Sequence, residues 1–175
     1  MSWSTRTSQP PILERALRAL LQLISVSAVG AAQRTERVEV PRLLVSGWLE
    51  NDSLSRDVAE WVAADLKRLI SYPRLFVVSG QEMERQLAGQ WYRRAADPMT
   101  AADLRLVARL MRADIIVDLA TRRTRAGIEV VPRRVRADTG VIDSLPTLTA
   151  STEREAAARL ARWLAENTLL IGIKP

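Results

Sequence analysis

Two short apolar runs with a strongly amphipathic segment between them constrain the fold of this chain most. The runs are Leu43–Val45 and Leu75–Val78. Between them, in Arg56–Ile70, apolar residues recur at the three- and four-residue spacing of one helix face. The second run is continuously apolar, which is typical of a strand covered on both faces. The sequence therefore predicts a sheet with helices packed against it.

The remainder of the chain predicts three more helices and three more strands. We expect helices over residues 80–91, 100–113 and 151–167, and strands over residues 113–125, 128–137 and 141–149. Pro132 within the second of these strands indicates an edge or a bulge. The element order predicts one α/β domain over residues 40–175, with a mixed sheet flanked by helices and a three-stranded meander near the C-terminal half.

The N-terminal segment contains an uncharged run, residues 19–33. Arginines precede this run and small residues end it, so residues 1–33 match a secretory signal cut near Ala31 or Ala32. The same segment also matches an amphipathic helix that is retained and anchors the protein to a membrane. A third alternative is a first helix that packs on the protein's own core. Residues 34–39 are the expected linker. The membrane-anchoring residues would be Leu13, Leu17, Leu20, Leu21, Leu23 and Ile24.

The chain has neither cysteine nor histidine. This excludes disulfides, thiol nucleophiles and thiolate or imidazole metal ligands, and it removes the commonest general base. The seven glycines are scattered, and no phosphate-binding loop occurs among them. We therefore expect a protein that is not an enzyme and that uses no cofactor.

Two aspartates in one expected strand form the only candidate cation site that the sequence suggests. Asp114 and Asp118 are four residues apart and so face the same side of a strand. Two carboxylates can hold a divalent cation if a third ligand joins them, here Asp138 or Asp143. The alternative is structural, with Asp114 in a turn and Asp118 solvated on the strand.

Basic residues are concentrated on two neighbouring strands of the expected meander, in a chain of net charge +6. Paired across a hairpin, they would form a positive patch for an acidic protein face, lipid headgroups or nucleic acid. Nucleic acid is the weaker alternative, because no aromatic residues lie nearby to stack on bases. A charged strand edge that prevents aggregation is the structural alternative. The residues are Arg122, Arg123, Arg125, Arg133, Arg134 and Arg136.

Two tryptophans and the C-terminal tail are further candidates for contacts with a partner. Trp48 and Trp91 lie at the ends of expected elements and can act as interface anchors or pack in the core. The tail carries Leu169, Leu170 and Ile171, which would form an apolar patch prone to association if they were exposed. We expect this tail to extend the edge of the sheet or to contact a partner.

Residues 40–167 resemble the N-terminal domain of the TolB family of bacterial envelope proteins. The resemblance rests on Arg112–Asp114 before a strand, on the basic hairpin Arg122–Gly127 and on Asp138–Gly140. The loop in Leu43–Asn51 and the strand Leu75–Val78 also match. The resemblance implies an envelope location and contacts with other proteins, and it implies no catalytic residues.

These observations together predict a non-catalytic periplasmic protein-interaction module. It would be a membrane-tethered accessory or scaffolding subunit of a larger envelope or inner-membrane complex, with other protein subunits as partners. The N-terminal helix would contact the membrane surface. The alternatives are a cytosolic nucleic-acid-binding module that uses the basic hairpin, and a periplasmic domain that binds a small ligand or a cation.

Overall fold

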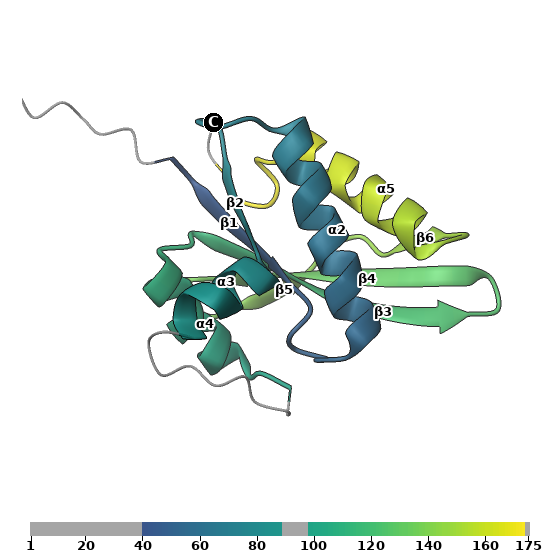
Figure 1. Cartoon of the computed structure of the whole chain (residues 1–175), viewed down its shortest axis with the longest axis horizontal. Coiled ribbons are helices and arrows are strands. Elements are labelled where there is room, and N and C mark those ends of the chain that lie inside the picture. The colour runs from purple at the N-terminus through teal and green to yellow at the C-terminus, as the bar shows by residue number, and fades with distance from the viewer. Residues whose placement is uncertain (1–39, 89–97, 174–175) are drawn as a thin grey trace, which may run out of the picture. The chain divides into compact units, whose positions relative to one another are not determined.

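The computed structural model describes residues 40–88 and 98–173 (Figure 1). A six-stranded mixed sheet runs through this part of the chain in the order β2-β1-β3-β4-β5, with β6 also paired to β4. The strands are β1 (Arg42–Ser46), β2 (Phe76–Ser79), β3 (Ile115–Thr124), β4 (Gly127–Arg136), β5 (Ile142–Ser144) and β6 (Leu148–Ala150). The helices are α2 (Ser53–Leu69), α3 (Gly80–Ala88), α4 (Ala101–Met111) and α5 (Glu153–Glu166).

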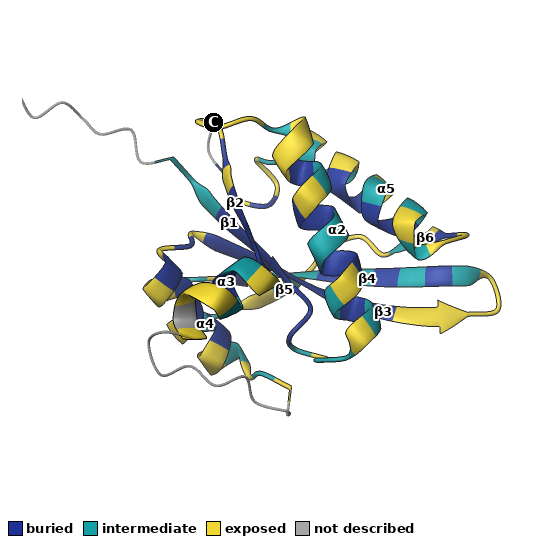
Figure 2. Cartoon of the chain, viewed as in Figure 1, coloured by how far each residue is buried: buried dark blue, intermediate teal, exposed yellow. Residues whose placement is uncertain are grey.

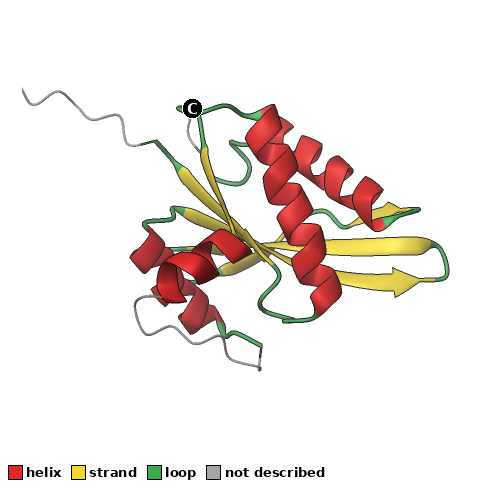
Figure 3. Ribbon diagram, in the orientation of Figure 1, coloured by secondary structure: helices red, strands yellow, loops and turns green. Residues whose placement is uncertain are grey.

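Helices cover both faces of the sheet, as the sequence predicts (Figure 3). Helices α2 and α5 pack on one face, and α3 and α4 pack on the other. Strand β3 shows why one sheet serves two cores. Its Ile115 and Val117 face α2 and α5, whereas Ile116 faces α4, because successive side chains point to opposite faces. The α/β class with a mixed sheet is therefore confirmed.

The predicted meander differs in its third strand. The expected strand over residues 141–149 is two short strands, β5 and β6, which pair with different parts of the same side of β4. Pro132 lies between these two pairings, and its carbonyl accepts a hydrogen bond from Leu145 N at 2.9 Å. The nitrogen of Pro132 points to the same side of β4 as its carbonyl. Because proline has no N–H, no hydrogen bond can form from this nitrogen, and the gap between β5 and β6 lies here. Pro132 therefore marks a divided neighbouring strand rather than an edge or a bulge.

Polar caps begin the helices. Thr100 caps α4 with a reciprocal bond to Asp103, and Thr152 caps α5. Asp52 caps α2 by accepting from Ser55 N at 2.8 Å. Ser55 donates its hydroxyl to Asp52 and accepts from Thr121 N on β3.

The C-terminal tail does not extend the sheet. It folds back after α5, and Ile171 and Ile173 are buried in the core under α2 and α5 (Figure 2). The expectation that Ile171 contacts a partner is wrong for this reason, whereas Leu169 and Leu170 are exposed. No helix in residues 40–88 and 98–173 is long and apolar enough to cross a membrane.

Several sequence predictions lie outside the described residues. These are the N-terminal segment of residues 1–33, the linker and the interface anchor Trp91. The anchoring residues Leu13, Leu17, Leu20, Leu21, Leu23 and Ile24 belong to that segment.

Candidate functional site

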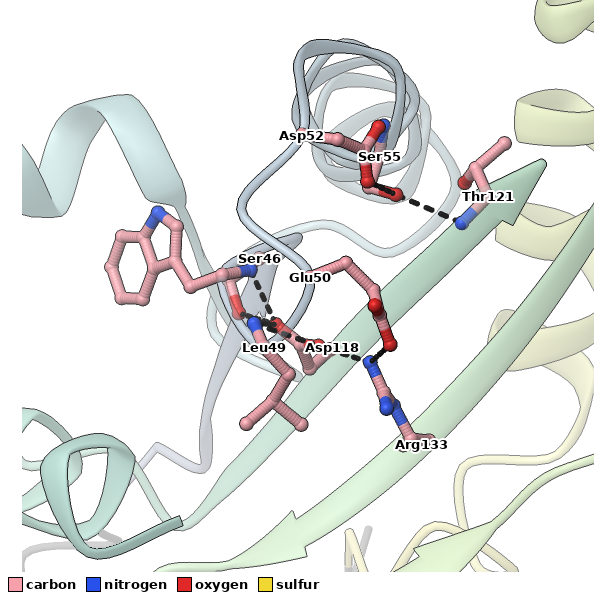
Figure 4. Close-up of polar contacts among 9 residues, drawn as sticks. Ser46, Leu49, Glu50, Asp52, Ser55, Asp118, Thr121 and Arg133 are labelled. Atoms are coloured by element: carbon pink, nitrogen blue, oxygen red, sulfur yellow. Dashed lines mark hydrogen bonds and ion pairs between the residues drawn. The ribbon is translucent and has the colours of Figure 1, made fainter. Parts of the chain in front are cut away.

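A buried carboxylate lies where β1 ends and its parallel pairing with β3 stops. Asp118 on β3 is fully buried. Its Oδ1 accepts from Ser46 Oγ at 2.8 Å and from Trp48 N at 2.7 Å. Leu49 N lies 3.4 Å from both of its oxygens. One side chain thus fixes the loop between β1 and α2, although about seventy residues of chain separate them (Figure 4).

An ion-pair chain continues from this carboxylate to the surface. Arg133 Nη2 on β4 lies 3.3 Å from Asp118 Oδ2 and 3.1 Å from Glu50 Oε1. Burial raises the pKa of Asp118 to about 6, against the opposing effects of the bonds from Ser46 and Trp48 and of the Arg133 charge. Desolvation disfavours the ionised form, and here it outweighs the donors that favour it.

The two aspartates of the candidate cation site, Asp114 and Asp118, do not come together. Four residues along a strand span about 13 Å, so one ion cannot reach both carboxylates. Asp114 accepts instead from Arg42 N at 2.8 Å. Asp143 pairs with Arg134, on the opposite face of the sheet from Asp118. The alternative of a solvated Asp118 is also wrong, because the β1–α2 loop and Arg133 cover it. The described residues include no group of three or more acidic side chains placed to hold a metal ion.

The β1–α2 loop fills the crevice in which open α/β sheets commonly bind ligands, beyond the carboxyl ends of the parallel strands. Trp48 in this loop is buried against α3 and α4, so its expected role as an exposed interface anchor is wrong. Gly47 allows the close packing, since a Cβ there would lie 2.6 Å from the backbone of Ser55. A shallow hollow of about 360 Å³ remains between α2 and α3.

The arginines of the expected basic patch lie in two separate groups. In the β3–β4 register Arg122 faces Glu129, whereas Arg134 faces Val117 near the other end of the hairpin. The prediction of one dense positive patch is therefore wrong. A partner-binding role for individual arginines stays a prediction. Acidic partners lie close to five of the six: Glu129 beside Arg122, Glu153 beside Arg123, Glu50 and Asp118 beside Arg133, and Asp143 beside Arg134 and Arg136. Within the described residues Arg125 has no ion pair.

The opposite end of the parallel strands has an apolar surface. Two adjoining hollows lie there, and both are lined by Ile70 and Leu75 from the connection between α2 and β2. One hollow, of about 430 Å³, follows β2 toward α3. The other, of about 510 Å³, reaches the end of α5 and the tail. We call this region the amino end. Its exposed apolar side chains are Leu69, Tyr72 and Phe76. Leu169 and Leu170 in the tail are exposed as well, and Leu170 O accepts a hydrogen bond from Arg134 Nη1 on β4.

Sequence reasoning missed both features. Asp118 looked like a solvent-facing strand residue, because the loop that covers it is remote in the sequence. The amino end combines residues from α2, β2, α5 and the tail, and none of these segments indicates a site by itself. Leu169 and Leu170 carried a signal, since apolar residues after the last helix were unexplained.

No protein-family model matches this chain, and no curated protein matches it. Comparison with solved structures finds weak likenesses in fold. TolB from Acinetobacter baumannii is 17% identical with a TM-score of 0.43, over 74% of this chain and 29% of that one. Lipoprotein GNA1162 from Neisseria meningitidis is 12% identical with a TM-score of 0.41, over 75% and 96%. PelC from Paraburkholderia phytofirmans, solved as a dodecamer, is 11% identical with a TM-score of 0.37, over 78% and 89%. This chain therefore matches less than a third of the TolB chain.

Proposed function

We propose that this protein is a non-catalytic interaction module of the bacterial envelope, an accessory or scaffolding subunit of a larger membrane complex. The observation that carries the proposal is the apolar surface of the amino end. Tyr72, which lines one hollow, is 71% exposed, and Leu69, which lines the other, is 53% exposed. In the tail that follows α5, Leu169 and Leu170 are 68% and 65% exposed. Exposed apolar side chains gathered at one end of a domain are typical of interaction sites.

The opposite end of the sheet supports the same function by contrast. There the loop held by Asp118 fills much of the crevice beyond β1, its Trp48 is buried, and a hollow of about 360 Å³ is left between α2 and α3. Ion pairs also engage most of the hairpin arginines, which leaves little free positive charge for nucleic acid. The amino end is apolar instead, and an apolar surface suits contact with another protein.

The envelope location rests on the N-terminal segment. Residues 12–33 have the pattern of an export signal or an anchor. The described domain begins at Val40, and β1 starts at Arg42 beside Phe76 at the start of β2.

Site-specific photo-crosslinking in the native host tests the proposal. A crosslinking amino acid is placed at Tyr72 or Leu170, with exposed Arg125 at the hairpin tip as the matched control. We expect adducts with an envelope protein, identified by mass, from the first two positions and none from Arg125. The proposal would be overturned if the protein were found in the soluble fraction and formed no adduct at any of the three positions. The intact mass from washed membranes and from the periplasmic fraction distinguishes a retained anchor from a cleaved signal.

A further inference from the structure

We propose that the free edge of β2 binds an extended, acidic segment of a partner protein as an added strand. The inference rests on the proposed function and gives the partner a chemistry. It depends on three properties of this edge, which are its unpaired backbone, the hollow beside it and the charges at the hollow's border.

The backbone of β2 has one side without a strand partner. Within the described residues β2 pairs only with β1, in a parallel register that sets Leu43 opposite Val77. Phe76 N donates to Pro41 O at 2.9 Å, so the backbone groups of Phe76 face β1. The direction of these groups alternates along a strand, and both the N–H and the C=O of Val77 therefore point to the free side. A residue opposite Val77 on an added antiparallel strand would exchange two hydrogen bonds with it.

A hollow runs along this edge, lined by residues of α2, β2 and α3, and we call it the slot. Helices α2 and α3 pack on opposite faces of the sheet, and residues from both line the hollow, so they form its two walls. Ile70 lies on the α2 side and Arg85 on the α3 side. The volume is about 430 Å³, and Phe76, which is 41% exposed, lies at its border. Apolar side chains of an added strand would contact Phe76 and Ile70.

A carboxylate of the protein itself already occupies one end of the slot. Ser79 N donates to Glu82 Oε2 at 2.9 Å, and Glu82 N donates to Ser79 Oγ at 3.3 Å, which caps the start of α3. Lys67 from α2 crosses to Glu82, with Nζ–oxygen distances of 2.6 and 2.7 Å. Added pairing would therefore stop before Ser79. Burial opposes ionisation of Glu82, yet the bonds from Lys67 and Ser79 and the Arg85 charge hold the pKa of Glu82 below its usual value.

The charges at the border favour an acidic occupant. Neither Arg85 nor Arg74 has an ion pair within the described residues. Arg85 lines the slot, and Arg74 lines the adjoining hollow just before Leu75. A second copy of this chain would bring the same arginines to the contact and would be repelled. An extended segment with acidic residues between apolar ones would pair its carboxylates with these arginines.

Peptide binding to the purified full-length protein tests the inference. The probe is a fluorescent ten-residue peptide of alternating valine and glutamate, and its counterpart carries lysine in place of glutamate. We expect the acidic peptide alone to raise anisotropy and to protect the Val77 amide from hydrogen exchange. Arg85→Glu should weaken binding of the acidic peptide by roughly tenfold. Arg68→Glu, an exposed reversal on α2 outside the slot, is the matched control and should change it by less than about twofold.

A proline variant tests the backbone contact. Val77→Pro removes an N–H that faces away from β1, at a position where an edge strand accepts proline. We expect peptide binding to be lost while the circular dichroism spectrum is kept. If the variant does not fold, the hydrogen exchange of Val77 in the unaltered protein decides the same point.

Three results would overturn the inference: equal binding of both peptides, bound peptide without protection of Val77, and protection of Val77 by phosphatidylglycerol vesicles but not by the peptide. The last result would identify the edge as a membrane contact. If these results occur while Tyr72 still crosslinks to its envelope partner, the proposed function stands and only the strand addition at β2 fails. Loss of that crosslink as well would overturn both.

Discussion

Replacing Asp118 by asparagine keeps the shape of the side chain and removes its charge. In the folded protein this carboxylate is out of contact with solvent and accepts from Ser46 Oγ and Trp48 N. Burial raises the pKa of Asp118 from an ordinary 3.8 to about 6, although these bonds and the charge of Arg133 act in the opposite direction. The folded protein therefore holds this proton more tightly than the unfolded chain does.

The sign of the pH dependence follows from this difference. Between the ordinary pKa and about 6, the folded state binds more protons than the unfolded state, so the free energy of unfolding falls as pH rises. The contribution of Asp118 is complete below the ordinary pKa and is lost as pH rises through about 6. At about 1.4 kcal/mol per pKa unit, the raised pKa corresponds to about 3 kcal/mol. Asp118→Asn does not ionise and should lack this component.

Urea unfolding followed by tryptophan fluorescence measures the difference directly, at several pH values from about 4 to about 7.5. We expect the unfolding free energy of the wild type, minus that of Asp118→Asn, to fall by roughly 2.4 kcal/mol over this range, since part of the full value of about 3 kcal/mol is already lost at about pH 4. Asp57→Asn is the matched control. It alters an exposed carboxylate on α2, and its difference from the wild type should stay nearly constant. A difference for Asp118→Asn that is constant, or that grows toward high pH, would show that the donors around Asp118 outweigh its burial and would refute the reasoning.

Four further substitutions test the fold by thermal or urea unfolding. Gly127→Ala should destabilise by roughly 2 kcal/mol or more, because φ is +125° and a Cβ would lie 2.2 Å from Ala150 O. A change below about 0.5 kcal/mol would contradict this geometry. Thr100→Ala removes the cap of α4 and should cost about 1 kcal/mol, and an unchanged midpoint would show that the cap contributes nothing. Leu160→Ala in the core should cost about 2–5 kcal/mol, whereas exposed Leu170→Ala should cost under about 0.5 kcal/mol, and equal costs would contradict the burial of Leu160.

Local periodicity was enough to predict most of the fold. Val58 and Val62 repeat at helical spacing and are both buried in α2. The alternation of Ile115, Ile116 and Val117 placed successive residues of β3 on opposite faces, and both faces are covered. These signals work because an amphipathic element carries the direction of its core in its own sequence. The break between β5 and β6 was missed, because it depends on the partner strand rather than on residues 141–149 alone.

The candidate sites were less predictable because they depend on register and on remote segments. The two groups of hairpin arginines seemed to form one patch, but the long β3–β4 pairing places them toward opposite ends. The acidic partners of Arg123 and Arg134 come from α5 and β5. A charge count cannot show this neutralisation, since it requires knowing which elements become neighbours in space.

The two ends of the parallel strands have different physical roles, so substitutions at one end should affect stability and substitutions at the other should affect binding. At the carboxyl end, Asp118 uses its hydrogen-bonding capacity within the protein, so its replacement should alter stability and its pH dependence while peptide binding at β2 is unchanged. At the amino end, exposed Arg85 has no ion pair in the described residues, so its replacement should alter binding far more than stability. If Asp118→Asn instead abolished peptide binding in a fully folded protein, the two ends would be coupled through β1 and β3, and the carboxyl end would belong to the functional site.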